Sequence, residues 1–468
     1  MLRDFIIGRI KSELPFAPNE EKSGLFEALG SFLVSREDRK AFILCGYAGT
    51  GKTSVTSALV RALHGLHQPC VLLAPTGRAA KVLSHYSGEQ AYTIHKKIYR
   101  QNQLGSESFS LSDNLHRNTL FIIDEASMLS GNRDNGTFGS GCLLDDLVRY
   151  VYNRQGCSML LVGDDAQLPP VGSINSPALN ADYMNQNYHL SCVSYQLTQV
   201  ARQALDSGIL SEATRVREIL NHPYASKKPI SLEPNGKDVV QLKGTEVIEQ
   251  LENSWREAGP EETLIIARSN KMTNLYNNGV RARILWKEDD LSNGDRVMVT
   301  KNNYFWAEEY EDLDFIANGD MYEIERLSNR HEMYGFHFAK ASLRSVDYHC
   351  EIEALVWLDT LTTDSPESNY MMQKELFSRI SEDYPDIRNR KELVKQIYAS
   401  PYYNALQIRF AYCVTCHKAQ GGQWRHVYID SGLGDEWLSG LSAEEVVEYT
   451  RWLYTAVTRA TEKIYLLR

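Results

Sequence analysis

The segment Gly46–Thr53, with the sequence GYAGTGKT, has the residue types and spacing of a phosphate-binding loop. It follows a short apolar run at 41–45 and precedes a stretch, 54–66, whose apolar residues recur at helical spacing. Glycines in such a strand-to-helix turn let backbone N–H groups converge on an anion at the helix N-terminus. Lys52 can then reach the outer phosphates of a nucleotide, and the Thr53 hydroxyl can ligate magnesium. The predicted cofactor-binding residues of this loop are Gly46, Tyr47, Ala48, Gly49, Thr50, Gly51, Lys52, Thr53 and Ser54.

Asp124 and Glu125 follow a second apolar run, LFII at 120–123. We expect Asp124 to hold magnesium through water and Glu125 to orient and deprotonate the water that attacks the γ-phosphate. An Asp-Glu pair is common on protein surfaces. The pair stands at a predicted strand end, in a chain that also carries GYAGTGKT. We favour the catalytic interpretation because the two motifs together supply the groups that bind a nucleotide and cleave its γ-phosphate.

Three further side chains are candidates for phosphate chemistry. Gln167, in GDDAQLPPVG at 163–172, offers a donor and an acceptor that could sense the γ-phosphate; a plain strand-to-turn connection remains an equal alternative. Arg202 in LTQVARQ and Arg459 in LYTAVTRA stand beside patterned elements. A guanidinium from a second domain can stabilise the charge that develops in phosphoryl transfer, and would couple domain closure to hydrolysis.

A cationic group follows the apolar run at 71–74. Hydroxyls and cations there suit a nucleic-acid backbone, and nearby aromatic side chains could stack on bases. The cationic and hydroxyl residues are Thr76, Arg78, Lys81, His95, Lys96, Lys97 and Arg100, and the aromatic ones are Tyr92, Tyr99 and Trp424. From the residues alone, a solvated basic helix face with core aromatics is equally good.

Elements that position these residues can be read from the apolar pattern. Strand-like runs at 41–45, 71–74, 119–123 and 158–162 alternate with helical stretches, which predicts an α/β fold with a parallel sheet. Ligands of such sheets bind at the carboxyl ends of the strands, where the polar clusters fall. The pattern restarts near residue 197, with strands at 263–267, 408–415 and 427–430, and an antiparallel β unit with two charged helices interrupts it at 305–400. The polar segment 96–117 could form a small hairpin.

Composition narrows the class of protein. A chain of 468 residues needs two or three domains, and a hydrophobic share of 43% is ordinary for a soluble protein. No membrane span or signal peptide is recognisable, so we expect a cytoplasmic protein with no membrane partner. The net charge of −10 argues against a wholly basic nucleic-acid coat.

Eight cysteines suggest reduced thiols. The C-x-x-C-H string at 413–417 would suit haem or zinc, but without an export signal or a second C-x-x-C we expect neither.

Eight strings in order resemble a known family. They are GYAGTGKT, APTGRAAK, YTIHKKIY, LFIIDEAS, VGDDAQLPPVG, QLTQVARQ, CVTCHKAQGGQW and LYTAVTRA. Together they resemble the superfamily 1 DNA helicases of the RecD-like and Dda-like branch, over about residues 15–465. Each string except the first is weak alone, and the shared order makes the resemblance specific.

The resemblance implies roles for individual residues. Lys52, Thr53, Asp124 and Glu125 keep the roles given above, Gln167 resembles the γ-phosphate sensor, and Arg202 and Arg459 resemble two phosphate-facing arginines. Gln420 and Gly421 would face the nucleotide. The implied nucleic-acid-binding residues are Pro75, Thr76, Arg78, His95, Lys96, Thr415 and His417.

The resemblance also implies a fold and an activity. We expect two RecA-like lobes, at 1–195 and at 196–304 with 401–468, and a β-rich insertion at 305–400. ATP and Mg²⁺ would bind between the lobes, and hydrolysis would move the protein along single-stranded DNA, 5′ to 3′ in this family, with 96–117 as a wedge at duplex junctions. We expect a monomer or a loose association. The alternatives are an ATPase that remodels protein–DNA complexes without unwinding, one that acts on RNA, or a scaffold with a decayed site, which the intact motifs oppose.

One residue departs from the family pattern. The family places a glutamine that reads adenine upstream of the phosphate loop, whereas Pro18-Asn19-Glu20-Glu21-Lys22 has lysine at that point. Selectivity for adenine is therefore in doubt, and other nucleoside triphosphates could be accepted.

Overall fold

The computed structural model describes residues 2–101, 109–133, 138–200, 207–221, 231–307, 310, 313, 315–346, 350–363, 365–432 and 442–467. The chain divides into two compact units. Among the described residues, the first unit holds 2–100, those from 109 to 231, and 442–458; the second holds Gln101, those from 232 to 432, and 459–467.

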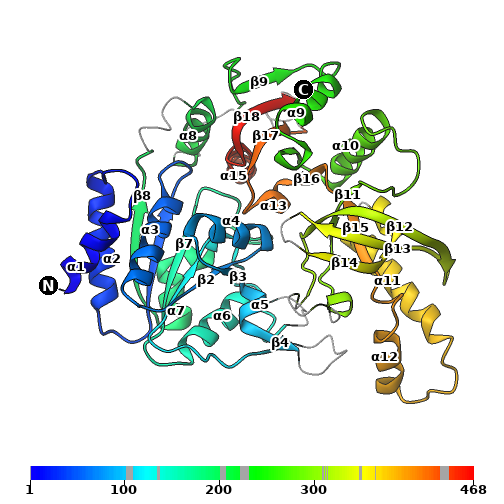
Figure 1. Cartoon of the computed structure of the whole chain (residues 1–468), viewed down its shortest axis with the longest axis horizontal. Coiled ribbons are helices and arrows are strands. Elements are labelled where there is room, and N and C mark those ends of the chain that lie inside the picture. Colours follow the sequence, from blue (N-terminus) through cyan, green and yellow to red (C-terminus); the bar gives the residue numbers. More distant parts are fainter. Residues whose placement is uncertain are drawn as a thin grey trace. The chain divides into compact units, whose positions relative to one another are not determined.

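The first unit is built on a six-stranded sheet with the order β3-β2-β6-β7-β1-β8 (Figure 1). Every neighbouring pair is parallel, which confirms the predicted α/β architecture. Central strands are buried along their whole length because helices cover both faces, as near-continuous apolar runs require. The strands are β1 Lys40–Gly46, β2 Cys70–Ala74, β3 Ala91–Thr93, β6 Leu120–Ile123, β7 Ser158–Gly163 and β8 Ser191–Leu197.

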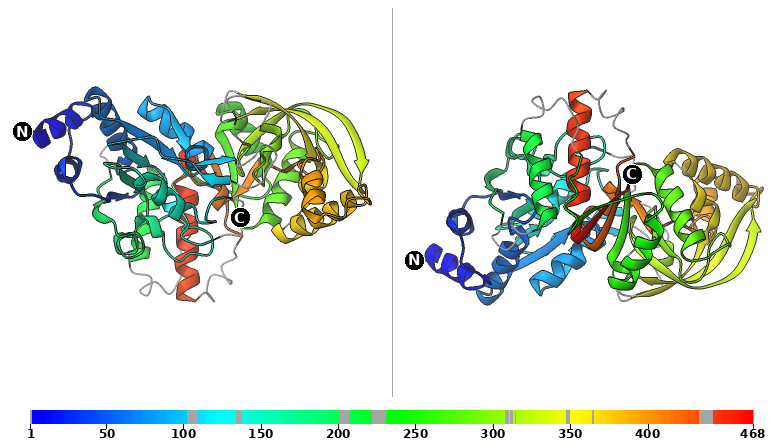
Figure 2. Two further views of the ribbon diagram at one scale, coloured as in Figure 1. Left: turned by 90° about the horizontal axis from the view of Figure 1, so that it is seen from below. Right: turned by 90° about the horizontal axis from the view of Figure 1, so that it is seen from above.

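Helices α1 to α4 pack on one face of this sheet and share a core with β1, β2, β6 and β7. A late segment, α15, also belongs to this unit and packs beside α8, as Figure 2 shows in red and green. The short strands β4 Tyr99–Gln101 and β5 Phe109–Leu111 form a two-stranded sheet, in agreement with the predicted hairpin. The helices are α1 Leu2–Ser12, α2 Glu20–Val34, α3 Lys52–Gly65, α4 Gly77–Ser87, α5 Ile94–Ile98, α6 Leu143–Tyr152, α7 Ala181–Tyr188, α8 Gly208–Asn221 and α15 Ala443–Val457, with short 3₁₀ turns at Ala126–Met128 and Pro177–Leu179.

The second unit contains a five-stranded parallel sheet with the order β16-β10-β17-β18-β9. Two separate parallel sheets agree with the expectation of two α/β lobes. The strands are β9 Val239–Leu242, β10 Thr263–Ala267, β16 Cys413–Thr415, β17 Trp424–Asp430 and β18 Ala460–Leu467. The helices around it are α9 Val247–Glu257, α10 Asn270–Arg283 and the short α13 Cys416–Ala419, with a 3₁₀ turn at Pro260–Glu262.

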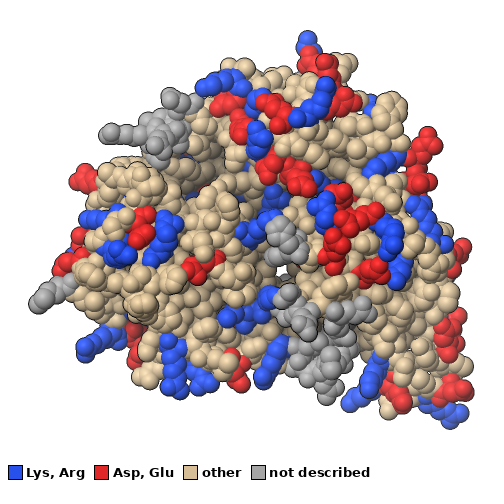
Figure 3. All heavy atoms as spheres, in the orientation of Figure 1, with Lys and Arg blue, Asp and Glu red and all other residues tan. Residues whose placement is uncertain are grey.

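A closed five-stranded barrel completes the second unit. Its ladders are antiparallel except the β14–β15 pair, which is parallel and closes the barrel. Acidic and basic side chains intersperse over its exposed strands, as in the Arg326–Glu353 and Lys340–Glu353 pairs (Figure 3). The barrel strands are β11 Arg296–Val299, β12 Met321–Met333, β13 Phe336–Ser345, β14 Glu351–Trp357 and β15 Leu406–Phe410; α11 Pro366–Ser381 and α12 Arg390–Tyr398 follow β14, and 3₁₀ turns lie at Phe305–Ala307 and Leu358–Thr362.

These boundaries differ from the expected ones in three places. The barrel includes β11 and β15, which flank the 305–400 insertion on both sides. The stretch 408–415, read as one strand, holds the end of β15 and the separate strand β16. Helix α15 lies in the first unit, although 401–468 was expected in the second lobe. Each difference depends on long-range packing, which the local apolar pattern does not encode.

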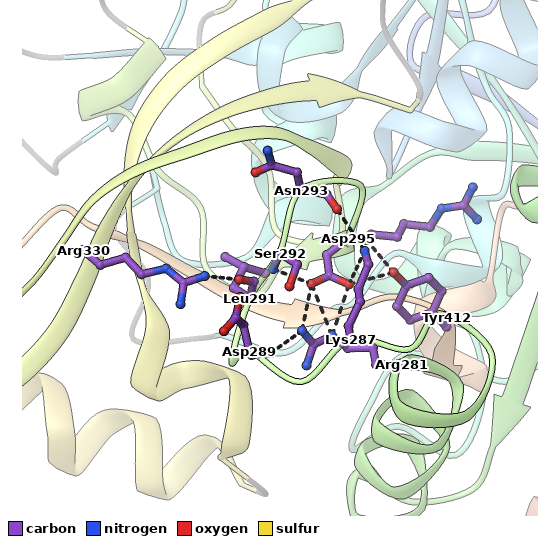
Figure 4. A network of polar contacts seen from close by, with 10 residues as sticks. Arg281, Lys287, Asp289, Leu291, Ser292, Asn293, Asp295, Arg330 and Tyr412 are labelled. Atoms are coloured by element: carbon purple, nitrogen blue, oxygen red, sulfur yellow. Dashed lines mark hydrogen bonds and ion pairs between the residues drawn. The ribbon is translucent and has the colours of Figure 1, made fainter.

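A buried charge network joins the barrel to the second sheet (Figure 4). Asp295, fully buried just before β11, accepts hydrogen bonds from Arg281 Nε at 3.1 Å and from Tyr412 Oη at 2.9 Å. Lys287 Nζ lies 3.0 Å from the same carboxylate, and the Ser292 backbone N–H donates to it at 2.7 Å. The fully satisfied carboxylate therefore ties α10, β11 and the lead into β16 together.

Within the described residues, no helix is both long and apolar enough to cross a membrane.

Candidate nucleotide and nucleic-acid sites

The predicted phosphate loop lies between β1 and α3. Gly49 and Gly51 adopt left-handed backbone conformations with φ of +75° and +91°, which residues with a side chain rarely adopt. At Gly46 the constraint is space, because a Cβ atom there would lie 2.9 Å from Thr50 Oγ1 and 3.0 Å from Lys52 Cγ. Glycine is therefore required at 49 and 51 by the backbone conformation and at 46 by the lack of space, as expected of a phosphate-binding loop.

Lys52, the first residue of α3, is held by oxygen atoms of its own loop and of β7. Its ammonium group donates to the backbone carbonyls of Gly46 and Tyr47 and lies 3.9 Å from Asp164 Oδ2. Asp164 follows β7 and is 1% exposed. Burial raises the pKa of Asp164, while Lys52 and a hydrogen bond from Tyr454 act in the opposite direction. The ion pair therefore places the lysine beside the loop.

Tyr454 on α15 links this carboxylate to the loop. Its hydroxyl donates to Asp164 Oδ2 at 2.7 Å and accepts from the Ala48 backbone N–H at 2.9 Å. The next residue, Thr455, accepts a hydrogen bond from Leu168 N at 2.8 Å. Sequence reasoning used LYTAVTRA only for its arginine and missed both hydroxyls. Two adjacent hydroxyl residues within the apolar stretch WLYTAV at 452–457 were the signal that could have found them.

Asp124 and Glu125 lie directly after β6, at the same carboxyl edge of the sheet as the phosphate loop. Burial and the Glu125 charge raise the pKa of Asp124 to about 7. Glu125 adopts φ +50° and ψ 37°, a left-handed conformation that costs energy for a residue with a side chain. Strain of this kind clusters at functional sites.

The predicted magnesium ligands fit a hard cation chemically. Thr53 supplies an exposed hydroxyl in the first turn of α3, and Asp124 supplies a carboxylate whose ionised form a cation would favour. Both roles stay predictions.

Gln167 lies in the turn after β7, where its backbone N–H donates to Asp164 O at 3.3 Å. The residue is 6% exposed, and within the described structure its Oε1 atom is buried without a hydrogen-bond partner. A buried unpaired amide oxygen costs about 1–3 kcal/mol. This cost is compatible with a role in ligand sensing, which stays a prediction.

In the second unit, two predicted motifs meet. Arg459, only 3% exposed, donates to the backbone carbonyl of Gly422 at 3.1 Å, and its own carbonyl accepts from Trp424 N at 2.9 Å. Gln420 is buried next to Gly421, which adopts φ +75°. The structure therefore brings Arg459 to the loop that carries Gln420 and Gly421. Arg202 lies outside the described residues.

The predicted nucleic-acid residues of the first unit follow β2 and β3. Pro75 precedes Thr76, whose side chain caps α4 by accepting from Ala79 N at 3.2 Å. Arg78 is half-buried in the first turn of α4, and Lys96 is exposed on α5. In the second unit, Thr415 ends β16 and His417 is exposed on α13.

His95 packs in an aromatic cluster, with ring centroids 5.0 Å from Phe138 and 5.7 Å from Tyr99. Burial lowers the pKa of His95 to about 4, so the imidazole is neutral near pH 7. At this pH His95 could offer a hydrogen bond to a nucleic acid but no positive charge.

For Tyr99 and Trp424 the structure favours the alternative of core aromatics over base stacking. Tyr99 is 9% exposed and donates from its hydroxyl to Asp146 Oδ2 at 2.8 Å, and Trp424 is 2% exposed in β17. Residue type alone does not distinguish an aromatic side chain in the core from one on an open surface. Tyr92 is partly exposed, and Lys97 Nζ lies over its ring, 5.1 Å from the centroid.

Comparison with known proteins matches two parts of the chain to protein families. Residues 28–219 match the AAA domain family, and residues 410–467 match the UvrD-like helicase C-terminal domain. The chain is 30% identical over 202 residues to the ATP-dependent RecD2 DNA helicase of Deinococcus radiodurans, covering 42% of this chain and 24% of that protein. It is 31% identical over 190 residues to the ATP-dependent DNA helicase Dda of Enterobacteria phage T4, covering 39% of each chain.

Matches over nearly the whole chain are more distant. An uncharacterized protein of Acanthamoeba polyphaga mimivirus is 24% identical over 504 residues, with 92% of this chain and 96% of that one covered. The crystal structure of a Bacteroides Pif1 helicase with ADP-AlF3 and single-stranded DNA aligns with a TM-score of 0.45 at 15% identity, covering 96% and 92% of the two chains.

The aligned region spans less than two fifths of either named helicase. The two domain matches and these relatives support the resemblance to the superfamily 1 helicases of the RecD, Dda and Pif1 branch.

Proposed function

We propose that the protein is an ATP-dependent DNA helicase that hydrolyses ATP as it moves along single-stranded DNA. The observation that carries this proposal is the gathering of Lys52, Asp124 and Gln167 at the carboxyl ends of three neighbouring parallel strands. The similarity to RecD2 and Dda, both named ATP-dependent DNA helicases, supports the choice of DNA.

The residues of the first unit divide the chemistry between binding and cleavage. Backbone N–H groups of the phosphate loop and the Lys52 ammonium hold the outer phosphates, and Asp164 with Tyr454 keeps that lysine and the loop in place. Glu125 accepts the proton of the attacking water. Magnesium, when bound at Thr53 and Asp124, would neutralise charge on the phosphates.

The remaining predicted residues contribute to charge stabilisation and to DNA contact. Arg202 and Arg459 would stabilise charge as the γ-phosphate leaves, and Gln420 with Gly421 would contact the nucleotide. Thr76, Arg78 and Lys96 in the first unit, and Thr415 and His417 in the second, would bind the DNA backbone. Movement from 5′ to 3′ follows from the family resemblance alone.

The test combines two assays on the same preparation. ATP hydrolysis is measured alone and with single-stranded DNA, single-stranded RNA or duplex DNA, and strand displacement is measured on a duplex with a 5′ or a 3′ single-stranded tail. We expect stimulation by single-stranded DNA and unwinding of the 5′-tailed duplex, both abolished by Lys52→Ala. If DNA stimulates ATP hydrolysis but neither duplex is displaced, the protein is a remodelling ATPase. If only RNA stimulates hydrolysis, the substrate is RNA.

A further inference from the structure

Lys22, on the first turn of α2, is a buried cation beside the phosphate loop. The residue is 2% exposed. A Cβ atom placed on Gly51 would lie 3.3 Å from Lys22 Cε and 3.8 Å from its Nζ. The side chain therefore packs against the glycine that immediately precedes Lys52 and α3.

The Lys22 ammonium lacks the partners that a buried charge requires. Among the described residues no hydrogen bond or ion pair of this ammonium group is found, and the centroid of the Phe16 ring lies 5.8 Å from Nζ. The adjacent Glu21 carboxylate is engaged elsewhere, since it accepts from Thr198 N and Oγ1 at 2.8 Å and from Gln199 N at 3.1 Å. Burial lowers the pKa of Lys22, and the charge of adjacent Glu21 opposes this shift without cancelling it.

The surroundings of this ammonium favour an anion. The N-terminus of α3, a helix of 14 residues, has no side-chain cap at Gly51, and its backbone N–H groups carry partial positive charge. Lys52 adds a full positive charge next to it. A buried lysine without a close anionic partner at a positive helix end is unfavourable alone, and a bound phosphate would supply that partner.

We propose that Lys22 is a second lysine of the phosphate site, one that binds a phosphate retained in the diphosphate product, so that the protein holds nucleotides by their phosphates and with little regard to the base. The proposal rests on the nucleotide site of the proposed function. A lysine offers only donors, so it cannot accept a hydrogen bond from the adenine amino group as a glutamine can. The position of Lys22 against the phosphate loop then explains why residue 22 is a lysine and not the glutamine of the family pattern.

The test measures equilibrium binding of ADP, GDP and inorganic pyrophosphate to the full chain by calorimetry, without DNA. Three substitutions are compared: Lys22→Met, of similar length without charge; Lys22→Arg, which keeps the charge; and Lys11→Met on α1 as a control for loss of a lysine elsewhere in the unit. We expect Lys22→Met to weaken all three ligands about tenfold, which is about 1.4 kcal/mol, with the ratio of ADP to GDP affinity unchanged. Lys22→Arg should retain most of the affinity, and Lys11→Met all of it.

Two results would overturn the proposal. A change in the ADP to GDP ratio of more than about fivefold, with pyrophosphate binding intact, would make Lys22 a reader of the base. Unchanged affinity for all ligands in a folded Lys22→Met protein would make it a packing residue. Failure of the unsubstituted protein to bind any of the three would instead contradict the nucleotide site itself, so the two failures are distinguishable. Melting temperatures of each variant identify any that unfold, and Lys22→Arg then decides between the outcomes.

Discussion

The Tyr454 hydroxyl donates a hydrogen bond to Asp164 Oδ2 at 2.7 Å, although the two residues are 290 positions apart in the chain. The same hydroxyl accepts from Ala48 N, and the same carboxylate lies 3.9 Å from Lys52 Nζ. One tyrosine thus touches the phosphate loop and the carboxylate that pairs with its lysine. Helix α15 is therefore part of the support of the nucleotide site.

Tyr454→Phe should impair nucleotide binding more than the chemical step. The substitution removes the acceptor for Ala48 N–H and the donor to a buried carboxylate, and a loosened loop binds phosphate less well. We expect KM for ATP to rise about tenfold, about 1.4 kcal/mol, with a smaller fall in kcat. Tyr188→Phe is the matched control, because it deletes a similar bond to Asp145 Oδ1 at 2.7 Å on other elements. An unchanged KM in Tyr454→Phe would limit this residue to packing.

Replacing Glu125 by glycine should raise the stability of the fold and abolish catalysis. Its left-handed conformation, with φ +50°, is unstrained for glycine, so Glu125→Gly should stabilise the fold by about 1 kcal/mol while removing the proposed base. Glu125→Gln, which keeps the strain, should bind ATP and fail to cleave it. Chemical denaturation and single-turnover hydrolysis together check both effects. Hydrolysis at the original rate in both variants would require another base.

Asp295→Asn should destabilise the second unit strongly. It leaves Arg281 and Lys287 buried without their carboxylate, and breaking a buried ion pair typically costs about 3–5 kcal/mol. Glu353→Gln on the barrel surface removes an exposed partner of Arg326 and Lys340 and should cost less than about 1 kcal/mol. Urea unfolding measures both. In dilute buffer, where the second unit stays folded, ADP binding should be unchanged in both variants, since neither Asp295 nor Glu353 is among the proposed nucleotide contacts.

His95 should make the first unit sensitive to acid. Its pKa is about 4 when folded, below its ordinary value of about 6.5, so between these values the unfolded chain binds a proton that the folded chain does not. Stability is therefore present above pH 6.5 and is lost as pH falls from 6.5 towards 4. His95→Phe keeps the aromatic contact with Phe138 and should remove about 2 kcal/mol of the loss between pH 7 and 5. Calorimetric melting at both pH values is the measurement, and an equal loss in variant and parent would contradict the assignment.

The sequence was most informative where the chemistry is local. GYAGTGKT needs a strand, a turn and a helix in immediate succession, and the runs before Asp124 and Gln167 mark strand ends whose meeting follows from parallel pairing. The Tyr454–Asp164 bond was not predictable in this way, because no local pattern encodes a contact across 290 residues. For the same reason the sequence could not distinguish buried Trp424 from an open stacking surface, or recognise that β15 closes the barrel.

Asn114 limits which residues can be removed to test the hairpin as a duplex wedge. Its side-chain amide is fully buried and donates to the carbonyls of Tyr150 at 3.0 Å and Val151 at 3.2 Å, so it anchors the segment after β5 to α6. A replacement that included Asn114 would break this anchor, so a loss of unwinding could not be separated from a loss of folding. A cut confined to 102–108, which the structure does not describe, would spare both β4 and β5.

We therefore expect replacement of 102–108 by a short glycine-serine linker to abolish strand separation and to leave DNA-stimulated ATP hydrolysis and single-strand translocation nearly unchanged. The phosphate loop and the proposed DNA contacts at Thr76, Arg78 and Lys96 lie outside the cut. Asn114→Ala serves as the comparison, because it should lower stability by about 1–3 kcal/mol through its unpaired carbonyls without separating the two activities. If unwinding survives the linker, the wedge lies elsewhere. If hydrolysis and translocation fall together with unwinding, the hairpin supports the first unit, since a splitting element acts only where duplex meets single strand.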